Sequence, residues 1–167
     1  GAFGTCYYYF EKQSIILTQY MIENRDEIVD ILHLAEAYFK DIENKQKKYI
    51  VTFSGNNDFH VINYLFEKYN IDFKITEHFN SLDLQKEYEK KFKENTGLKA
   101  LEKKFGIIRE GELISGSNLA KTFSKVIKDK DYIVRMPSDK ITKILKYNEQ
   151  DVVNLFRISM DWEKLPL

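Results

Sequence analysis

Two short runs of strand-forming residues, separated by only three polar residues, constrain the fold of this chain most strongly. Residues 5–10 (TCYYYF) and 14–20 (SIILTQY) are rich in β-branched and aromatic side chains, and Glu11, Lys12 and Gln13 lie between them. Two such runs this close together predict a β-hairpin, because so short a connection allows only antiparallel pairing. The hairpin excludes an all-helical fold.

The rest of the chain alternates between short apolar strands and amphipathic helices. Asn24, with Glu27 three residues later, is similar to a capping box and predicts a helix that reaches about residue 40. Strands are predicted over 49–53 and 71–75, and helices over 58–69, 83–92, 98–105, 118–128 and 138–162. Gly106 is expected at a helix C-terminus. This order of elements predicts an α/β fold with a small mixed sheet.

The composition excludes several classes of protein. Hydrophobic residues make up 43% of the 167 residues, which is enough for a core and argues against disorder. The 26 basic and 26 acidic residues balance, which excludes a histone-like protein. No apolar run approaches the roughly 18 residues that span a bilayer. The single cysteine, Cys6, excludes an internal disulfide and is expected to be a core residue. Abundant Lys, Asn, Ile and Tyr are typical of an AT-rich bacterium, and we expect a cytoplasmic protein without membrane contact.

Asp151 lies on or beside the apolar face of the last predicted helix. Ile144, Tyr147, Asp151, Leu155 and Ile158 are spaced three or four residues apart, so they share one face. A buried carboxylate is costly unless it is paired, hydrogen-bonded or bound to a metal. The spacing also fits an Asp at the edge of the stripe that reaches water or caps a neighbouring loop.

Asp58 is a second candidate, because it follows a turn between a predicted strand and a helix. Ligands of α/β proteins bind at the carboxyl ends of strands, although an Asp at this place also fits as a helix N-cap. Together Asp58 and Asp151 suggest a divalent-metal site, because Mg²⁺ and Mn²⁺ prefer oxygen ligands. Tyr147, one turn before Asp151, is placed to orient or help deprotonate a metal-activated water.

Other chemistries have less support in the sequence. Neither GxxxxGK[ST] nor GxGxxG is present, which argues against a nucleotide-binding loop. The three histidines, His33, His60 and His78, form no close pair of the kind that binds zinc.

Charge is unevenly distributed along the chain. Residues 20–45 contain seven acidic and three basic side chains, whereas residues 121–146 contain eight basic and three acidic ones. Residues 85–104 are also basic, with seven bases and four acids. The basic segments fit either a surface that follows a phosphate backbone or ordinary solvated helix faces.

Several of these segments, taken in order, resemble one family. Residues 51–58 (VTFSGNND) and the helix after them resemble the second motif of DEDD-type exonucleases, most closely the YprB-like ribonuclease-H-like branch. Residues 147–151 (YNEQD) resemble the third motif, Tyr-x-x-x-Asp. Residues 82–84, 98–109 and 114–116 resemble further segments of that branch. The resemblance covers nearly the whole chain, and the order of the motifs is more specific than any single one.

The chain departs from the family pattern in several places. Ser54 stands where the family usually has Asn, Asp58 comes about one residue early, and Tyr147 stands where close relatives often carry His. The first motif, Asp-x-Glu on the central strand, is absent, and the hairpin is similar to the second and third strands. We therefore expect residues 1–167 to be a single, N-terminally incomplete ribonuclease-H-like exonuclease domain whose first strand lies upstream of Gly1.

The resemblance implies a mixed central sheet flanked by helices and a metal-dependent 3′→5′ exonuclease acting on DNA or RNA. Asp58 and Asp151 are expected to bind two Mg²⁺ or Mn²⁺ ions together with the first-motif acids, and Tyr147 is expected to position the attacking water. The expected partner is single-stranded or 3′-ended nucleic acid, contacted by Asn56, Asn57, Lys99, Arg109 and Arg135. Arg109 is favoured because its guanidinium suits phosphate, and a structural salt bridge is the alternative.

Two other functions remain open at this point. One is a non-catalytic nucleic-acid-binding module on a degenerate ribonuclease-H-like fold, and the other is a protein-interaction domain in which Asp58 and Asp151 are structural. Without the first motif, we expect little or no cleavage by residues 1–167 alone.

Overall fold

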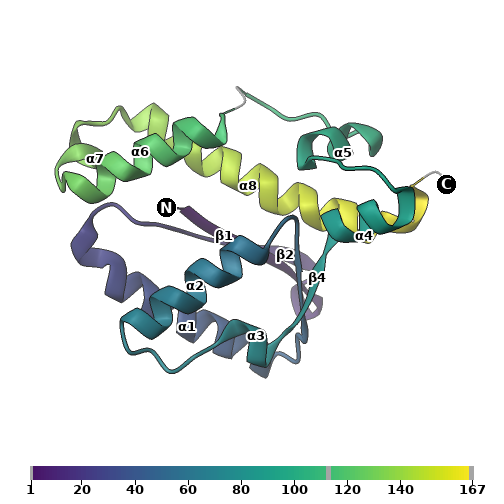
Figure 1. Ribbon diagram of the computed structural model, residues 1–167, viewed down its shortest axis with the longest axis horizontal. Helices are drawn as coiled ribbons and strands as arrows, with labels where there is room; N and C mark the ends of the chain where they lie inside the picture. The colour runs from purple at the N-terminus through teal and green to yellow at the C-terminus, as the bar shows by residue number, and fades with distance from the viewer. Residues whose placement is uncertain (1, 112–113, 166–167) are drawn as a thin grey trace. The chain divides into compact units, whose positions relative to one another are not determined.

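A computed structural model describes residues 2–111 and 114–165 and confirms the predicted α/β class (Figure 1). Helices accompany one antiparallel and one parallel pair of strands. The chain divides into two compact units, the first formed by residues 1–28 and 106–160 and the second by residues 29–105 and 161–167. That these units form one domain stays a prediction.

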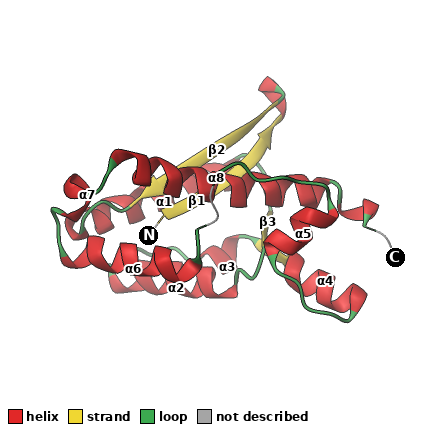
Figure 2. Cartoon of the chain, turned by 90° about the horizontal axis from the view of Figure 1, so that it is seen from above, coloured by secondary structure: helices red, strands yellow, loops and turns green. Residues whose placement is uncertain are grey.

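The first unit contains a β-hairpin, two short helices and one long helix. Its elements are β1 (Ala2–Tyr9), β2 (Ser14–Met21), α6 (Gly116–Lys128), α7 (Tyr132–Arg135) and α8 (Ser138–Met160). The predicted hairpin is confirmed: β1 and β2 pair antiparallel from Ala2 opposite Met21 to Tyr9 opposite Ser14 (Figure 2). A 3₁₀ turn and a left-handed Gln13, with φ of 48°, close it.

The hairpin packs along α8 (Figure 1). The Gln19 side chain donates to the Leu145 carbonyl at 2.8 Å and to the Asn148 side chain at 2.9 Å. Gly4 allows this approach, because a Cβ there would stand 2.3 Å from the Asn148 Oδ1 atom. These contacts fix one side of α8 against the strands.

Helices α6 and α7 cover the first half of α8 with a small apolar core. Its buried members are Val126, Ile133, Met136 and Ile144. Ser115 caps α6 by accepting from the Asn118 backbone N–H at 3.2 Å. The side of α6 that carries Val126 therefore faces the interior of the first unit.

The second unit contains a pair of parallel strands, five α-helices and one 3₁₀ helix, Trp162–Lys164, among its described residues. Its elements are α1 (Ile28–Asn44), β3 (Tyr49–Thr52), α2 (Asn56–Lys68), α3 (Ile75–His78), β4 (Asn80–Asp83), α4 (Leu84–Phe92) and α5 (Leu98–Lys104). Four phenylalanines form much of its core: Phe39, Phe66, Phe73 and Phe79. The expected strand over 71–75 is wrong, since β4 begins at Asn80 and pairs with β3.

The helix signals in the sequence are largely confirmed. Asn24 caps the turn before α1 by accepting from the backbone N–H groups of Asp26 and Glu27, and Gly106 takes a positive φ of 69° after α5. Asp58 is not an N-cap, because Gly55 occupies that position of α2.

Candidate functional site

The turn after β3 is held by a buried carboxylate from the neighbouring strand. The register places Thr52 opposite Asp83 at the ends of β3 and β4. Asp83 as a whole is 9% exposed. Its carboxylate accepts hydrogen bonds from the backbone N–H groups of Ser54 at 2.9 Å and Gly55 at 3.2 Å. It also accepts from Gln85 at 3.0 Å and so caps α4. These charge-assisted bonds compensate for the burial of the carboxylate.

The backbone of this turn needs the residues that the sequence provides. Ser54 has a positive φ of 59°, which only a minority of non-glycine residues adopt. At Gly55 a Cβ would stand 2.4 Å from the Thr52 side chain, so a larger residue requires a shift. The turn therefore has a fixed geometry, which determines where α2 begins.

Asp58 lies in the first turn of α2, directly after this fixed turn. Its side chain is exposed, as are those of Asn56 and Asn57, and it forms no hydrogen bond or ion pair within the described residues. Partial desolvation by its surroundings nevertheless raises the pKa of the Asp58 carboxyl. An anion is favourable at a helix N-terminus, since the helix dipole is positive there. Asp58 is thus a carboxylate at a helix N-terminus whose side chain has no bonding partner within the described residues.

Tyr147 and Asp151 lie one turn apart on α8, in the first unit, and Arg109 contacts both. The Arg109 guanidinium forms an ion pair with the Asp151 carboxylate, and its Cζ lies 5.0 Å from the centre of the Tyr147 ring. The side chain of Arg109 is 7% exposed and that of Asp151 is 35% exposed. The segment that carries Arg109 is itself fixed, because Glu110 and Gln150 exchange two hydrogen bonds of 2.9 and 3.0 Å.

The other predicted contacts with nucleic acid are found in different settings. Arg135, on α7, is largely exposed and forms an ion pair with Asp129. Lys99 is half-buried in the first turn of α5. The phosphate contacts predicted for Lys99, Arg109 and Arg135 stay predictions, although Arg109 and Arg135 each have a carboxylate partner within the chain.

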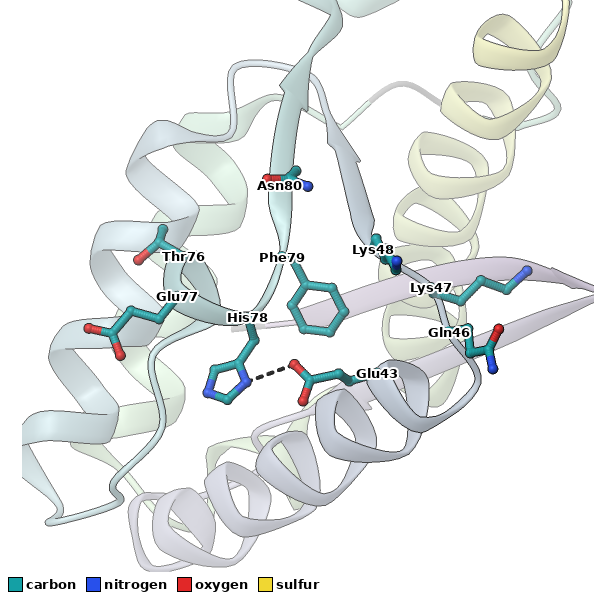
Figure 3. A pocket seen from close by; sticks show the side chains of 9 residues that line it. All are labelled: Glu43, Gln46, Lys47, Lys48, Thr76, Glu77, His78, Phe79 and Asn80. Carbon is teal, nitrogen blue, oxygen red and sulfur yellow. Dashed lines mark hydrogen bonds and ion pairs between the residues drawn. The ribbon is translucent and has the colours of Figure 1, made fainter.

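A separate pocket of about 370 Å³ lies in the second unit (Figure 3). The Nδ1 atom of His78 lies 2.7 Å from a carboxylate oxygen of Glu43, and the His78 ring stacks on Phe73. Neither Asp58 nor Asp83 lines this pocket. The His78–Glu43 pair connects α3 with α1 and adds nothing to the carboxylates described above.

The residue that sequence reasoning undervalued is Asp83. The sequence places it only in a resembling segment and at the start of a predicted helix, yet Asp83 organises the turn that precedes the candidate ligand Asp58. The available signal was its place directly before a helix, which is typical of an N-cap. Its bonds to Ser54 and Gly55 connect residues almost thirty positions apart and leave no local signal.

Comparison with known protein families agrees with this picture. The sequence profile of the RNase H superfamily matches residues 2–163, nearly the whole chain. The chain belongs to the RNase H superfamily. Neither the curated proteins nor the solved structures compared include a match. Membership suggests nuclease activity and a nucleic-acid substrate, and nucleases of this superfamily generally use divalent metals. No helix in the described ranges is long and apolar enough to cross a membrane.

The predicted ligands Asp58 and Asp151 fit such metals in chemical type. Asp58 and Asp151 supply the oxygen ligands that Mg²⁺ and Mn²⁺ prefer. Asp83 is less available, since backbone N–H groups of Ser54, Gly55 and Gln85 already use three of the roughly four acceptor positions of its carboxylate. Within residues 2–111 and 114–165, no three His, Cys, Asp or Glu side chains gather as a metal-binding group. Asp58 lies in the second unit and Asp151 in the first, and the role of each as a metal ligand stays a prediction.

Proposed function

We propose that the full-length protein is a metal-dependent 3′→5′ exonuclease of the DEDD type, similar to the YprB-like branch. In this proposal Asp58 and Asp151 are metal ligands that act with at least one further carboxylate. The substrate is the 3′ end of a DNA or RNA strand. The observation that supports this best is the setting of Asp58, an unpaired carboxylate held at the carboxyl end of a parallel strand by a turn that Asp83 fixes.

The bound Mg²⁺ or Mn²⁺ ions would supply charge stabilisation for the entering and leaving oxygens of the phosphodiester. The residues of this chain have simpler tasks. Asp58 and Asp151 would hold the ions, and the Tyr147 hydroxyl would orient the attacking water. The Arg109 guanidinium donates to the Oδ1 atom of Asp151, which fixes the direction in which the carboxylate points. Its cationic group over the Tyr147 ring holds that side chain in place as well.

The test compares Asp58→Asn with a matched control in the full-length gene product. Asp58→Asn removes one charge and breaks no side-chain bond of the fold, and Asp72→Asn does the same at another exposed position of the second unit. The substrates are a 5′-labelled linear 20-nucleotide strand and an internally labelled circular strand of the same sequence, each with Mn²⁺. We expect a ladder that shortens from the 3′ end, no cutting of the circle, and loss of cleavage in Asp58→Asn only.

Each result decides part of the proposal. If Asp58→Asn cleaves as fast as the parent, Asp58 is not a metal ligand and the assignment is wrong. If the circle is cut, the enzyme is an endonuclease and the 3′-end requirement is wrong. If the parent binds the strand but cleaves neither form with Mn²⁺ or Mg²⁺, the protein is not a nuclease.

A specific observation favours a second candidate, a non-catalytic nucleic-acid-binding module. The Asp151 carboxylate already has a cationic partner, the nearly buried Arg109. In that case Asp151 and Asp83 are both structural, and the protein retains only the shape and the basic surface of the fold. This candidate predicts binding that weakens steeply with salt, with no metal-dependent cleavage by the full-length protein.

A further inference from the structure

Helix α6 carries a row of lysines on the side that faces away from the core. Lys121, Lys125 and Lys128 are spaced four and three residues apart, which places them within about 60° of one another around the helix axis. All three are exposed. The row is about 10 Å long, from the rise of 1.5 Å per residue.

Nothing on α6 neutralises these charges. The helix contains no acidic residue, and none of the three lysines forms an ion pair within the described part of the chain. By contrast, α4 has three lysines of its own with Glu87 and Glu89 among them. The lysine row is therefore a local concentration of positive charge in a chain whose formal net charge is zero.

The remaining side of α6 shows what kind of partner the row suits. Leu119, Phe123 and Val126 pack into the core of the first unit. A helix that lies in a membrane surface needs its apolar face free to enter the lipid, and here that face is used in the fold. Ser117 and Ser124 flank the lysines with hydroxyl groups, and the Lys125 ammonium lies 5.8 Å from the centre of the Tyr132 ring. The row offers charge and hydrogen bonds, which are what a phosphate backbone requires.

We propose that the α6 row of Lys121, Lys125 and Lys128 is a binding surface for the phosphate backbone of a single-stranded nucleic acid. The inference rests on the proposed function only for the chemistry of the ligand and does not require cleavage. The row contacts the strand through its charge and does not read its sequence, because lysines act on phosphate as point charges. It differs from the contacts predicted at Lys99, Arg109 and Arg135.

The experiment measures binding of a fluorescein-labelled 20-nucleotide oligo-dT strand to the full-length protein in EDTA, between 50 and 200 mM salt. The variant K121Q/K125Q/K128Q is compared with K86Q/K90Q/K91Q, which removes the same charge from α4. A plot of log K against log salt has a negative slope, and each lost phosphate contact makes that slope shallower by about 0.7. We expect the α6 variant to lose about 2 from this slope, a difference of about 16-fold over the fourfold range of salt. The α4 variant should keep the slope of the parent.

Three results would overturn the proposal. The slope and affinity of the α6 variant could equal those of the parent, or the α4 variant could lose as much. In a third case the parent binds phosphatidylcholine vesicles containing 30% phosphatidylserine through these lysines and does not bind the strand. Because EDTA prevents metal-dependent cleavage, failure of the exonuclease proposal leaves this measurement unaffected. Circular dichroism of both variants checks that they are folded.

Discussion

The ion pair between Arg109 and Asp151 predicts an unequal response to removing its two partners. Asp151→Asn takes the carboxylate away from a guanidinium whose side chain is 7% exposed, so water cannot replace the lost charge. Arg109→Met takes the cation away from a carboxylate that is 35% exposed and can be hydrated. Asp151→Asn should therefore destabilise the protein more than Arg109→Met.

The magnitude follows from the burial of the two side chains. Removing one partner of a fully buried pair costs about 3–5 kcal/mol, whereas an exposed pair contributes about 0–1 kcal/mol. This pair lies between those limits, so we expect Asp151→Asn to lower the free energy of unfolding by about 2 kcal/mol. Arg109→Met should cost about 1 kcal/mol, which includes its contact with the Tyr147 ring. The double variant should cost about 2 kcal/mol, so that the coupling energy is about 1 kcal/mol.

The assay is urea unfolding of the parent, both single variants and the double variant, followed by circular dichroism at one pH and salt concentration. For a chain of this length, a cost of about 2 kcal/mol also lowers the Tm by about 4–8 °C. If the two single costs add to within about 0.5 kcal/mol of the double cost, the pair is not coupled and the reasoning is wrong. Equal costs for the two single variants would refute the role of burial.

Two further predictions concern the acids of the β3–α2 turn and the single cysteine. Asp83→Asn should lower the free energy of unfolding by about 1–3 kcal/mol, because backbone N–H groups lose a charged acceptor. The isosteric Asp58→Asn should change the free energy of unfolding by less than about 0.5 kcal/mol. Urea unfolding of both variants measures this difference, and equal costs would contradict the prediction. Burial raises the pKa of the Cys6 thiol from 9.0 to about 11. At pH 8 native Cys6 should therefore react with iodoacetamide about a hundredfold more slowly than in urea. The contribution of the protonated Cys6 thiol to the free energy of unfolding should be complete below pH 9 and lost as the pH rises through about 11.

Local signals in the sequence predicted local structure well. The hairpin, the Asn24 cap and the positive φ at Gly106 each depend on residues within a few positions of one another. The parallel strand β4 lies at 80–83 and not at the predicted 71–75. A four-residue strand with three exposed residues carries too little hydrophobic pattern to be located from the sequence. The apolar residues at 71, 73 and 75 instead enter the core from a loop and the start of α3.

The sequence predicted which residues are candidates for the site, but not the hydrogen bonds and ion pairs that those residues form. Periodicity placed Tyr147 and Asp151 on one face of the last helix, and the structure confirms that they lie one turn apart on α8. It could not show that Arg109, more than forty positions away, pairs with Asp151. The same holds for Asp83 and the turn at Ser54. Such bonds are set by tertiary packing, and a single sequence contains no periodic trace of them.

The three carboxylates differ in how much of their charge the fold already uses, and this decides what each can do. Both oxygens of Asp83 accept backbone N–H groups, and one oxygen of Asp151 accepts from Arg109. Asp58 has no such partner within the described residues, yet its neighbours partly desolvate it and raise its pKa. Placing an unpaired carboxylate in a partly desolvated position costs free energy, since desolvation disfavours the charged form. A cation bound there would recover that cost, whereas at Asp83 it would have to share the carboxylate with the backbone N–H groups on which the turn depends. Asp58 is therefore the carboxylate whose removal tests ligand binding without testing the fold.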